Sequence, residues 1–83
     1  MVLEIISPEA ILVSGAVTSV SVPGINGEFQ MLKNHAPIVS ALGKGNVKIL
    51  KDKNTNETYS IQSGFVEVLN NKVTVLVEGA NAL

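Results

Sequence analysis

Cysteine and arginine are absent from this 83-residue chain, and only three residues are aromatic. Without cysteine the chain has no disulfide and no thiolate that could act as a nucleophile or a metal ligand. Its one histidine, His35, is too few for a usual zinc site. The sequence therefore predicts no metal site, and a core built by aliphatic packing, for which the 46% hydrophobic content is sufficient.

The charge is also low, with a formal net charge of −1 at pH 7 and six lysines as the only basic residues besides the histidine. This balance argues against nucleic-acid binding and against electrostatic attachment to an anionic bilayer. The longest apolar run, Ala10–Val13, is far shorter than the roughly 20 residues that span a membrane. No basic segment followed by an apolar stretch marks a secretory signal. We expect a soluble cytoplasmic protein with no direct membrane insertion.

Alternation of apolar and polar residues with a period of two dominates the chain and predicts β-strands. The length predicts a single domain over residues 1–83. Eight to ten short strands with frequent turn signals indicate an all-β fold, either an antiparallel sandwich or a small barrel. The clearest predicted strands are Val2–Ile6, Ile11–Val13, Val17–Val22, Glu28–Leu32, Val39–Leu42, Asn46–Leu50, Glu57–Gln62, Phe65–Leu69 and Val73–Val77.

Several local signals predict where strands end. Gly24–Gly27 is expected to be a turn, and Asn70-Asn71 a two-residue hairpin turn, because asparagine tolerates positive φ. Gly15 is expected to stop the second strand. The segment Gly79–Leu83, rich in small residues, is expected to be frayed.

The segment Pro23–Pro37 gathers two glycines, Glu28 and His35, and loops on a β scaffold often carry recognition residues. A phosphate-binding glycine loop would open a helix, but here a strand follows and no Gly-Lys-Ser/Thr motif is present. A catalytic histidine needs a nucleophile and an orienting carboxylate, and none stands at a recognisable spacing. We therefore predict no catalytic residue and no cofactor. His35 is interpreted as a loop-stiffening residue or an interface contact, and Glu28 as a solvated charge or a charge offered to a partner.

Lys53 lies in a predicted hairpin of a small all-β domain, which is how lipoyl and biotinyl carrier domains present their modified lysine. Asn54-Thr55-Asn56 follows it, where those carriers have other residues, so a solvated turn lysine is the simpler interpretation. A carrier domain with Lys53 as its attachment site stays open as an alternative function, as does a free-standing β interaction module.

Four blocks in the same order resemble the epsilon subunit of F-type ATP synthases. They cover nearly the whole chain, and together they are highly specific. They are Leu3–Ser7 followed by Glu9, Gly27–Phe29 followed by His35–Ser40, Ile61–Val68, and Lys72–Ala80. Gln30–Asn34 replaces the family's usual glycine-containing stretch, and Ser63 stands where a glycine is common. Asn34 can supply the turn that glycine gives.

The resemblance implies a two-sheet antiparallel β-sandwich of about ten short strands and a non-catalytic rotor subunit of the central stalk. Such a subunit links the gamma subunit to the polar loops of the c-ring, so that ion-driven rotation is coupled to ATP synthesis. It sits peripherally at the cytoplasmic face of the membrane. The implied c-ring contacts are Asn26, Gly27 and Glu28, and the implied gamma contacts are Ser7, His35, Val39 and Leu42.

The family's C-terminal helical hairpin is missing after Leu83, so the resemblance is to the N-terminal domain alone. Inhibition of ATP hydrolysis and sensing of ATP, which the family assigns to that hairpin, are therefore not expected of these residues.

Overall fold

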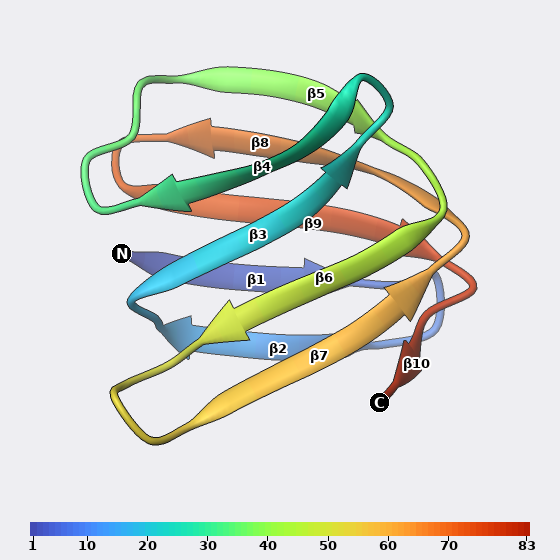
Figure 1. The fold of residues 1–83 in the computed structure, drawn as a ribbon, viewed down its shortest axis with the longest axis horizontal. Helices are drawn as coiled ribbons and strands as arrows, with labels where there is room; N and C mark the ends of the chain where they lie inside the picture. The colour runs from blue at the N-terminus through green and yellow to red at the C-terminus, as the bar shows by residue number, and fades with distance from the viewer.

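Ten β-strands and no helix make up the structure, a computed structural model that describes residues 1–83 (Figure 1). The all-β prediction is confirmed, and nothing in the structure is a helix of the length and apolarity needed to cross a bilayer. The strands are β1 (Val2–Ile6), β2 (Ile11–Ala16), β3 (Ser19–Gly24), β4 (Gly27–Leu32), β5 (Ile38–Leu42), β6 (Gly45–Leu50), β7 (Asn56–Ile61), β8 (Ser63–Leu69), β9 (Lys72–Glu78) and β10 (Asn81–Ala82).

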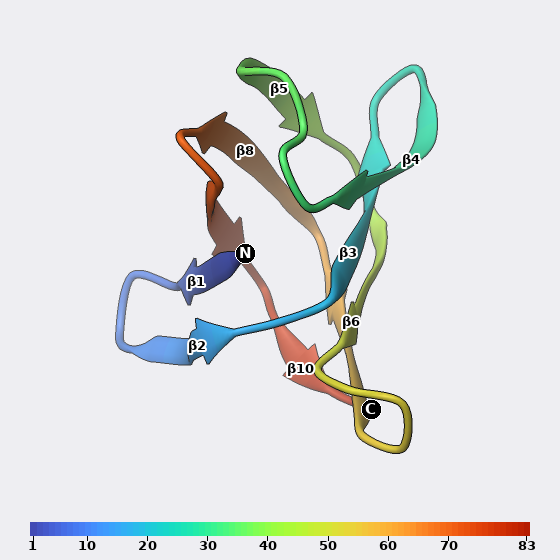
Figure 2. The ribbon, with the colours of Figure 1, turned by 90° about the vertical axis from the view of Figure 1, so that its left-hand side faces the viewer.

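The strands form one continuous ladder, in the order β10-β7-β6-β3-β5-β8-β9-β1-β2, with β4 paired to β3. The ladder curls into two layers that face each other (Figure 2). The front layer, nearer the viewer in Figure 1, holds β4, β3, β6, β7 and β10; the back layer holds β5, β8, β9, β1 and β2. A single residue pair, Gly24 with Leu42, joins the two layers in the ladder. The predicted two-sheet sandwich is confirmed.

One strand pair departs from the antiparallel prediction. β1 runs parallel to β9, with Val2 opposite Lys72 and Ile6 opposite Leu76, whereas every other pair is antiparallel. The first strand of the chain therefore lies between its own hairpin partner, β2, and a strand from near the C-terminus.

The core lies between the layers and consists of the inward-facing residue at every second strand position. Sixteen buried hydrophobic residues form one cluster, and each buried valine, leucine or isoleucine contributes about 1.5–3 kcal/mol. Val73, Val75 and Val77 share the inward face of β9. The cluster is Leu3, Ile5, Val13, Val17, Val20, Val22, Met31, Leu42, Val47, Ile49, Ile61, Val66, Val68, Val73, Val75 and Val77.

The structure corrects two predicted strand ends near Gly15. Gly15 lies inside β2, which continues to Ala16, and its φ of 146° shows why glycine is accommodated there. The next strand begins at Ser19 rather than Val17, because the chain crosses from the back layer to the front layer at Val17 and Thr18.

The expectation of a frayed C-terminal segment is wrong. Asn81 and Ala82 form β10 opposite Ser60 and Tyr59 of β7. The Leu83 N–H also donates to the carbonyl oxygen of Thr58 over 2.9 Å. The segment is ordered because the edge of β7 offers backbone groups that need partners.

Candidate functional site

The hairpin between β3 and β4 presents the residues predicted to face a c-ring. Gly24 pairs with Gly27, so Ile25 and Asn26 form the tip, and Gly27 has a φ of 130°. A Cβ on Gly24 would lie 2.7 Å from the Gly27 carbonyl oxygen, so this position also requires glycine. The predicted turn is therefore confirmed, and its two glycines serve backbone geometry.

Two backbone hydrogen bonds hold this tip against β5 and the residue after it. The Ile25 N–H donates to the Ala41 carbonyl over 3.2 Å, and the Gly43 N–H donates to the Pro23 carbonyl over 2.8 Å. The tip is therefore fixed relative to both layers.

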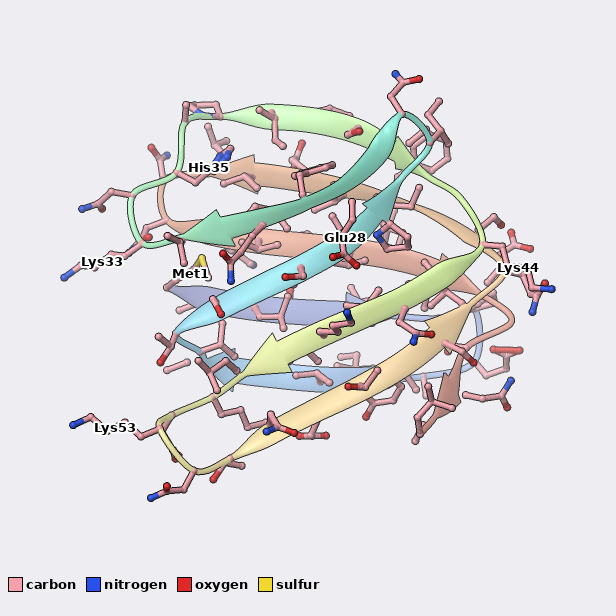
Figure 3. The ribbon with its side chains drawn as sticks, viewed as in Figure 1. Met1, Glu28, Lys33, His35, Lys44 and Lys53 are labelled. Carbon is pink, nitrogen blue, oxygen red and sulfur yellow. The ribbon has the colours of Figure 1, made fainter.

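Glu28 lies two residues beyond the tip, on the outer face of the front layer (Figure 3). Its Oε2 atom is 3.7 Å from the Nζ atom of Lys48 on β6. Both side chains are more than half exposed, so this ion pair contributes little to stability. The Glu28 carboxylate is available to a partner at small cost.

His35 lies in the loop between β4 and β5, at the other end of the molecule's face from the β3–β4 tip (Figure 3). Its N–H donates to the Leu32 carbonyl over 3.1 Å, and its Nδ1 lies 2.7 Å from the Ala36 carbonyl, close enough to donate a hydrogen bond. No acid or hydroxyl is hydrogen-bonded to the ring. The geometry fits a histidine that stiffens the loop and leaves one ring edge for a partner.

Asn34 provides the bend of this loop with a φ of 64°, as glycine would. Its N–H donates over 2.9 Å to Oδ1 of Asn71, in the hairpin turn between β8 and β9. Asn70 and Asn71 have φ of 50° and 62°, which confirms the predicted two-residue turn. The position of His35 therefore depends on a side chain 36 residues further along the chain.

Ser7 closes the turn between β1 and β2. Its hydroxyl lies 3.2 Å from both the carbonyl and the N–H of Ala10, and its N–H donates to the same carbonyl over 2.8 Å. These bonds hold Ser7 at the end of the back layer.

The predicted gamma contacts fall at two ends of the back layer. Ser7 and Leu42 line one hollow of about 490 Å³, together with Phe65 and Leu76. Val39, 73% exposed on β5, lies toward the end near His35. Leu42 is only 3% exposed because it is at an inward position of β5, so its side chain belongs to the core and we remove it from the predicted contacts.

Lys53 occupies the exposed turn between β6 and β7 (Figure 3). An ion pair between Lys51 and Glu57 closes this hairpin, and that carboxylate raises the pKa of Lys51. The Asn54 N–H donates to Oδ1 of Asp52 over 2.9 Å and, with the Thr55 hydroxyl, lowers the pKa of Asp52 below its usual value. These are the interactions of a solvated hairpin.

No group of three or more His, Cys, Asp or Glu side chains is placed to hold a metal ion. The residues that the sequence interpretation missed are the outward-facing apolar ones of the back layer, chiefly Phe65, Leu76 and Ile11. The sequences of β8 and β9 do indicate such a surface, because apolar residues also stand at the outward-facing positions of these two strands.

Residues 1–82 match the family described as "ATP synthase, Delta/Epsilon chain, beta-sandwich domain". The chain belongs to this family. It is 42% identical over 76 residues to the ATP synthase epsilon chain of Chlorobaculum tepidum, covering 92% of this chain and 86% of that one. It is 47% identical over 78 residues to the ATP synthase epsilon chain of Lawsonia intracellularis, covering 94% of this chain and 58% of that one. The resemblance identified from the sequence is confirmed.

Two solved structures show the same fold. A chain of the Euglena gracilis mitochondrial ATP synthase, OSCP/F1/c-ring, superposes with a TM-score of 0.92 at 19% identity, over 99% of this chain and 52% of that chain. A chain of the Tetrahymena thermophila mitochondrial ATP synthase, central stalk and c-ring, gives 0.84 at 15% identity, over 98% and 65%. The chain therefore spans about half the length of the Euglena chain and of the Lawsonia relative. Membership of the family over residues 1–82 favours a stalk subunit over a carrier domain with Lys53 as its attachment site.

Proposed function

We propose that this epsilon-type domain is a non-catalytic rotor subunit in the central stalk of an F-type ATP synthase. It links the gamma subunit to the polar loops of the c-ring and couples ion-driven rotation to ATP synthesis. The observation that supports this most strongly is the family match over residues 1–82, with relatives named ATP synthase epsilon chain at more than 40% identity.

The fold suits a part that transmits torque. The structure has 52 backbone–backbone hydrogen bonds, of which 41 lie within the strand ladder, and one core joins both layers. Close-packed interiors have low compressibility and transmit strain. Two layers locked in this way resist shear between a partner on one side and a partner on the other.

We assign the c-ring contact to Asn26, Gly27 and Glu28, because they run from the fixed tip of the β3–β4 hairpin into β4 and are all exposed. We assign the gamma contact to Ser7, His35 and Val39, on the back layer and the loop that enters it. Through the c-ring the domain would sit peripherally at the membrane surface, on the cytoplasmic face.

The experiment replaces Glu28 with lysine in the assembled enzyme. Reversing a charge at a polar contact weakens association, so we expect Glu28→Lys to reduce ATP synthesis driven by an ion gradient in membrane vesicles, with hydrolysis by the detached head unchanged. The matched control is the double variant Glu28→Lys with Lys48→Glu, which restores the local ion pair in reverse.

If the defect came only from losing the pair with Lys48, the double variant would regain coupling. If Glu28 meets the c-ring, the double variant stays defective. Coupled synthesis equal to the wild type in both variants would show that Glu28 has no part in the contact.

A further inference from the structure

Asn26 is the only asparagine of this chain that is followed by glycine. It lies in the turn between β3 and β4 (Figure 1), and both Asn26 and Gly27 are exposed. In such a pair, the backbone nitrogen of the glycine can attack the side-chain amide of the asparagine. Glycine favours this reaction because it has no Cβ to obstruct the approach and its backbone rotates more freely than that of other residues. The turn therefore brings a reactive pair to the surface.

No hydrogen bond restrains Asn26. Its side chain takes part in none of the side-chain hydrogen bonds of the chain. Its backbone lies outside the strands and makes none of the backbone hydrogen bonds of the turns and loops. The two bonds that fix the tip use the backbone groups of Ile25 and Pro23 instead. The amide of Asn26 is therefore free to rotate toward the nitrogen of Gly27.

The space around the pair is open as well. No atom beyond the adjacent residues lies within 4 Å of the place that a Cβ on Gly27 would occupy. The side chain of Ile25, which precedes the pair, is 64% exposed, so it does not cover the tip. None of these residues belongs to the core cluster. The tip can therefore deform locally without disturbing the core.

The other asparagines differ from Asn26 in sequence and in restraint. Each of them precedes a residue that has a Cβ. Oδ1 of Asn71 accepts the N–H of Asn34 over 2.9 Å, and the N–H of Asn54 donates to the carboxylate of Asp52. These asparagines therefore serve as internal references for the reaction rate at Asn26.

We propose that Asn26 is a site of spontaneous deamidation, at which the chain modifies itself through a cyclic imide formed between Asn26 and Gly27. Base removes the proton from the backbone nitrogen of Gly27, and this nitrogen attacks Cγ of Asn26. The N–Cγ bond forms as the Cγ–Nδ2 bond breaks, and Nδ2 takes up a proton and leaves as ammonia. The chain itself supplies the nucleophile and the leaving group, so the reaction does not depend on the proposed function.

Water then opens the imide in one of two ways. Attack at Cγ breaks the new N–Cγ bond and gives aspartate with an ordinary backbone. Attack at the backbone carbonyl carbon breaks the original peptide bond and gives isoaspartate, whose main chain runs through Cβ and Cγ. Both products add a negative charge at residue 26 to a chain whose formal net charge is −1, and no atom is oxidised or reduced.

The isoaspartate product also changes the shape of the tip. It lengthens the main chain by a methylene group inside the turn that connects Gly24 to its pairing partner Gly27. Loop length sets the geometry of a hairpin, so the longer turn strains this pairing and the bond from the Ile25 N–H to the Ala41 carbonyl. Under the proposed function, this change falls within the surface assigned to the c-ring.

The experiment follows the purified, folded chain during incubation at mildly alkaline pH. Trypsin first cuts after Lys33, so the N-terminal peptide holds Asn26 as its only asparagine. We expect this peptide to gain the mass difference between an amide and a carboxylic acid several-fold faster than the peptides that hold the other asparagines. The rate should rise with pH, because the attacking nitrogen must lose its proton.

Two controls decide the assignment. Asn26→Gln keeps an amide but forms its larger ring far more slowly, so its peptide should stay unmodified, which also excludes Gln30 of the same peptide as the source. The second control repeats the incubation in urea. A rate at Asn26 no greater than at the other asparagines of the folded chain would overturn the proposal. A mass gain that persists in Asn26→Gln, or one that occurs in urea alone, would overturn it as well.

The isoaspartate product has its own readout. Chromatography separates it from the unmodified chain, and the Asn26→Asp variant is the matched control, with the same added charge on an ordinary backbone. We expect the Ile25 amide of the isoaspartate chain to exchange with solvent several-fold faster than that of Asn26→Asp. Equal exchange of the Ile25 amide in the two chains would refute the distortion of the tip.

Discussion

Asn71 has two roles that no other residue of the chain combines. Its backbone, with a φ of 62°, forms half of the turn between β8 and β9, and its side chain accepts the hydrogen bond from Asn34. The first role is local and the second joins two loops that are distant in sequence. Glycine at residue 71 could form the same turn, but only the Asn71 side chain also holds the loop that carries His35.

Substituting Asn71 separates these roles. Asn71→Gly keeps a residue that adopts positive φ and removes the side-chain acceptor, so we expect the Asn34 amide to exchange several-fold faster with solvent. Asn71→Ala adds the cost of a left-handed backbone and should lower the free energy of unfolding by about 1 kcal/mol more. Amide exchange by NMR and urea unfolding measure the two effects.

Asn70→Gly is the control for the Asn71 variants, since it changes the same turn and leaves the bond to Asn34 in place. Unaltered exchange of the Asn34 amide in Asn71→Gly would mean that the loop is held by other contacts.

At the scale of single strands, Gly64 on β8 lies against β9 with no room for a side chain. A Cβ at this position would collide with the carbonyl oxygen of Leu76 on the neighbouring strand. Gly64 also precedes Phe65, so a shift of β8 here would displace this exposed side chain.

We expect Gly64→Ala to lower the free energy of unfolding by about 1–3 kcal/mol, the usual cost of overpacking. Gly43→Ala is the matched control, because a Cβ there would have only Ile25 nearby, at 3.9 Å. Chemical denaturation of both variants makes the comparison. A Gly64→Ala domain as stable as the Gly43→Ala domain would show that β8 relaxes without cost.

The strands with the cleanest alternation could be predicted from sequence, and the pairing partners could not. Val66, Val68, Val73, Val75 and Val77 alternate with polar or exposed residues, and all five are buried as expected. The parallel pairing of β1 with β9 depends on contacts that no local pattern encodes. β10 was missed because two residues carry no periodicity.

The candidate site likewise has features that could be predicted from the sequence and features that could not. The family resemblance predicts contacts at Asn26–Glu28, Ser7 and His35, and the structure gives each of them a defined backbone environment. The sequence interpretation placed Leu42 at the surface because it recognised the strand but not which alternate residues of that strand face inward. Ile38, Ser40 and Leu42 share one side of β5, and the core takes that side.

At the scale of the whole molecule, the two layers share one core, although only one residue pair, Gly24 with Leu42, joins them in the strand ladder. Neither layer can bury its inner face alone, because each needs the other's side chains opposite it. We therefore expect a single cooperative unfolding transition.

Leu3→Ala tests this cooperativity from the back layer, where Leu3 is fully buried. Removing a buried leucine side chain costs about 2–5 kcal/mol, a large share of the stability of so small a domain. We expect the most protected amides of β3 and β6, in the front layer, to exchange faster by the same free energy as those of β8 and β9. A back layer that opens while the front layer stays protected would show two independent units.

The parallel pairing of β1 with β9 has a consequence for synthesis of the chain. Val2 lies beside Lys72, and Ile6 beside Leu76, across a separation of 70 residues. On the ribosome, β1 can pair with β2 early, but its other edge stays open until residue 76 has emerged. Contacts of such high sequence separation form slowly and leave strand edges exposed in the meantime. The first strand of this domain is thus among the last to be completed, and a nascent chain that stalls before β9 would offer an unpaired edge to chaperones or to other nascent chains.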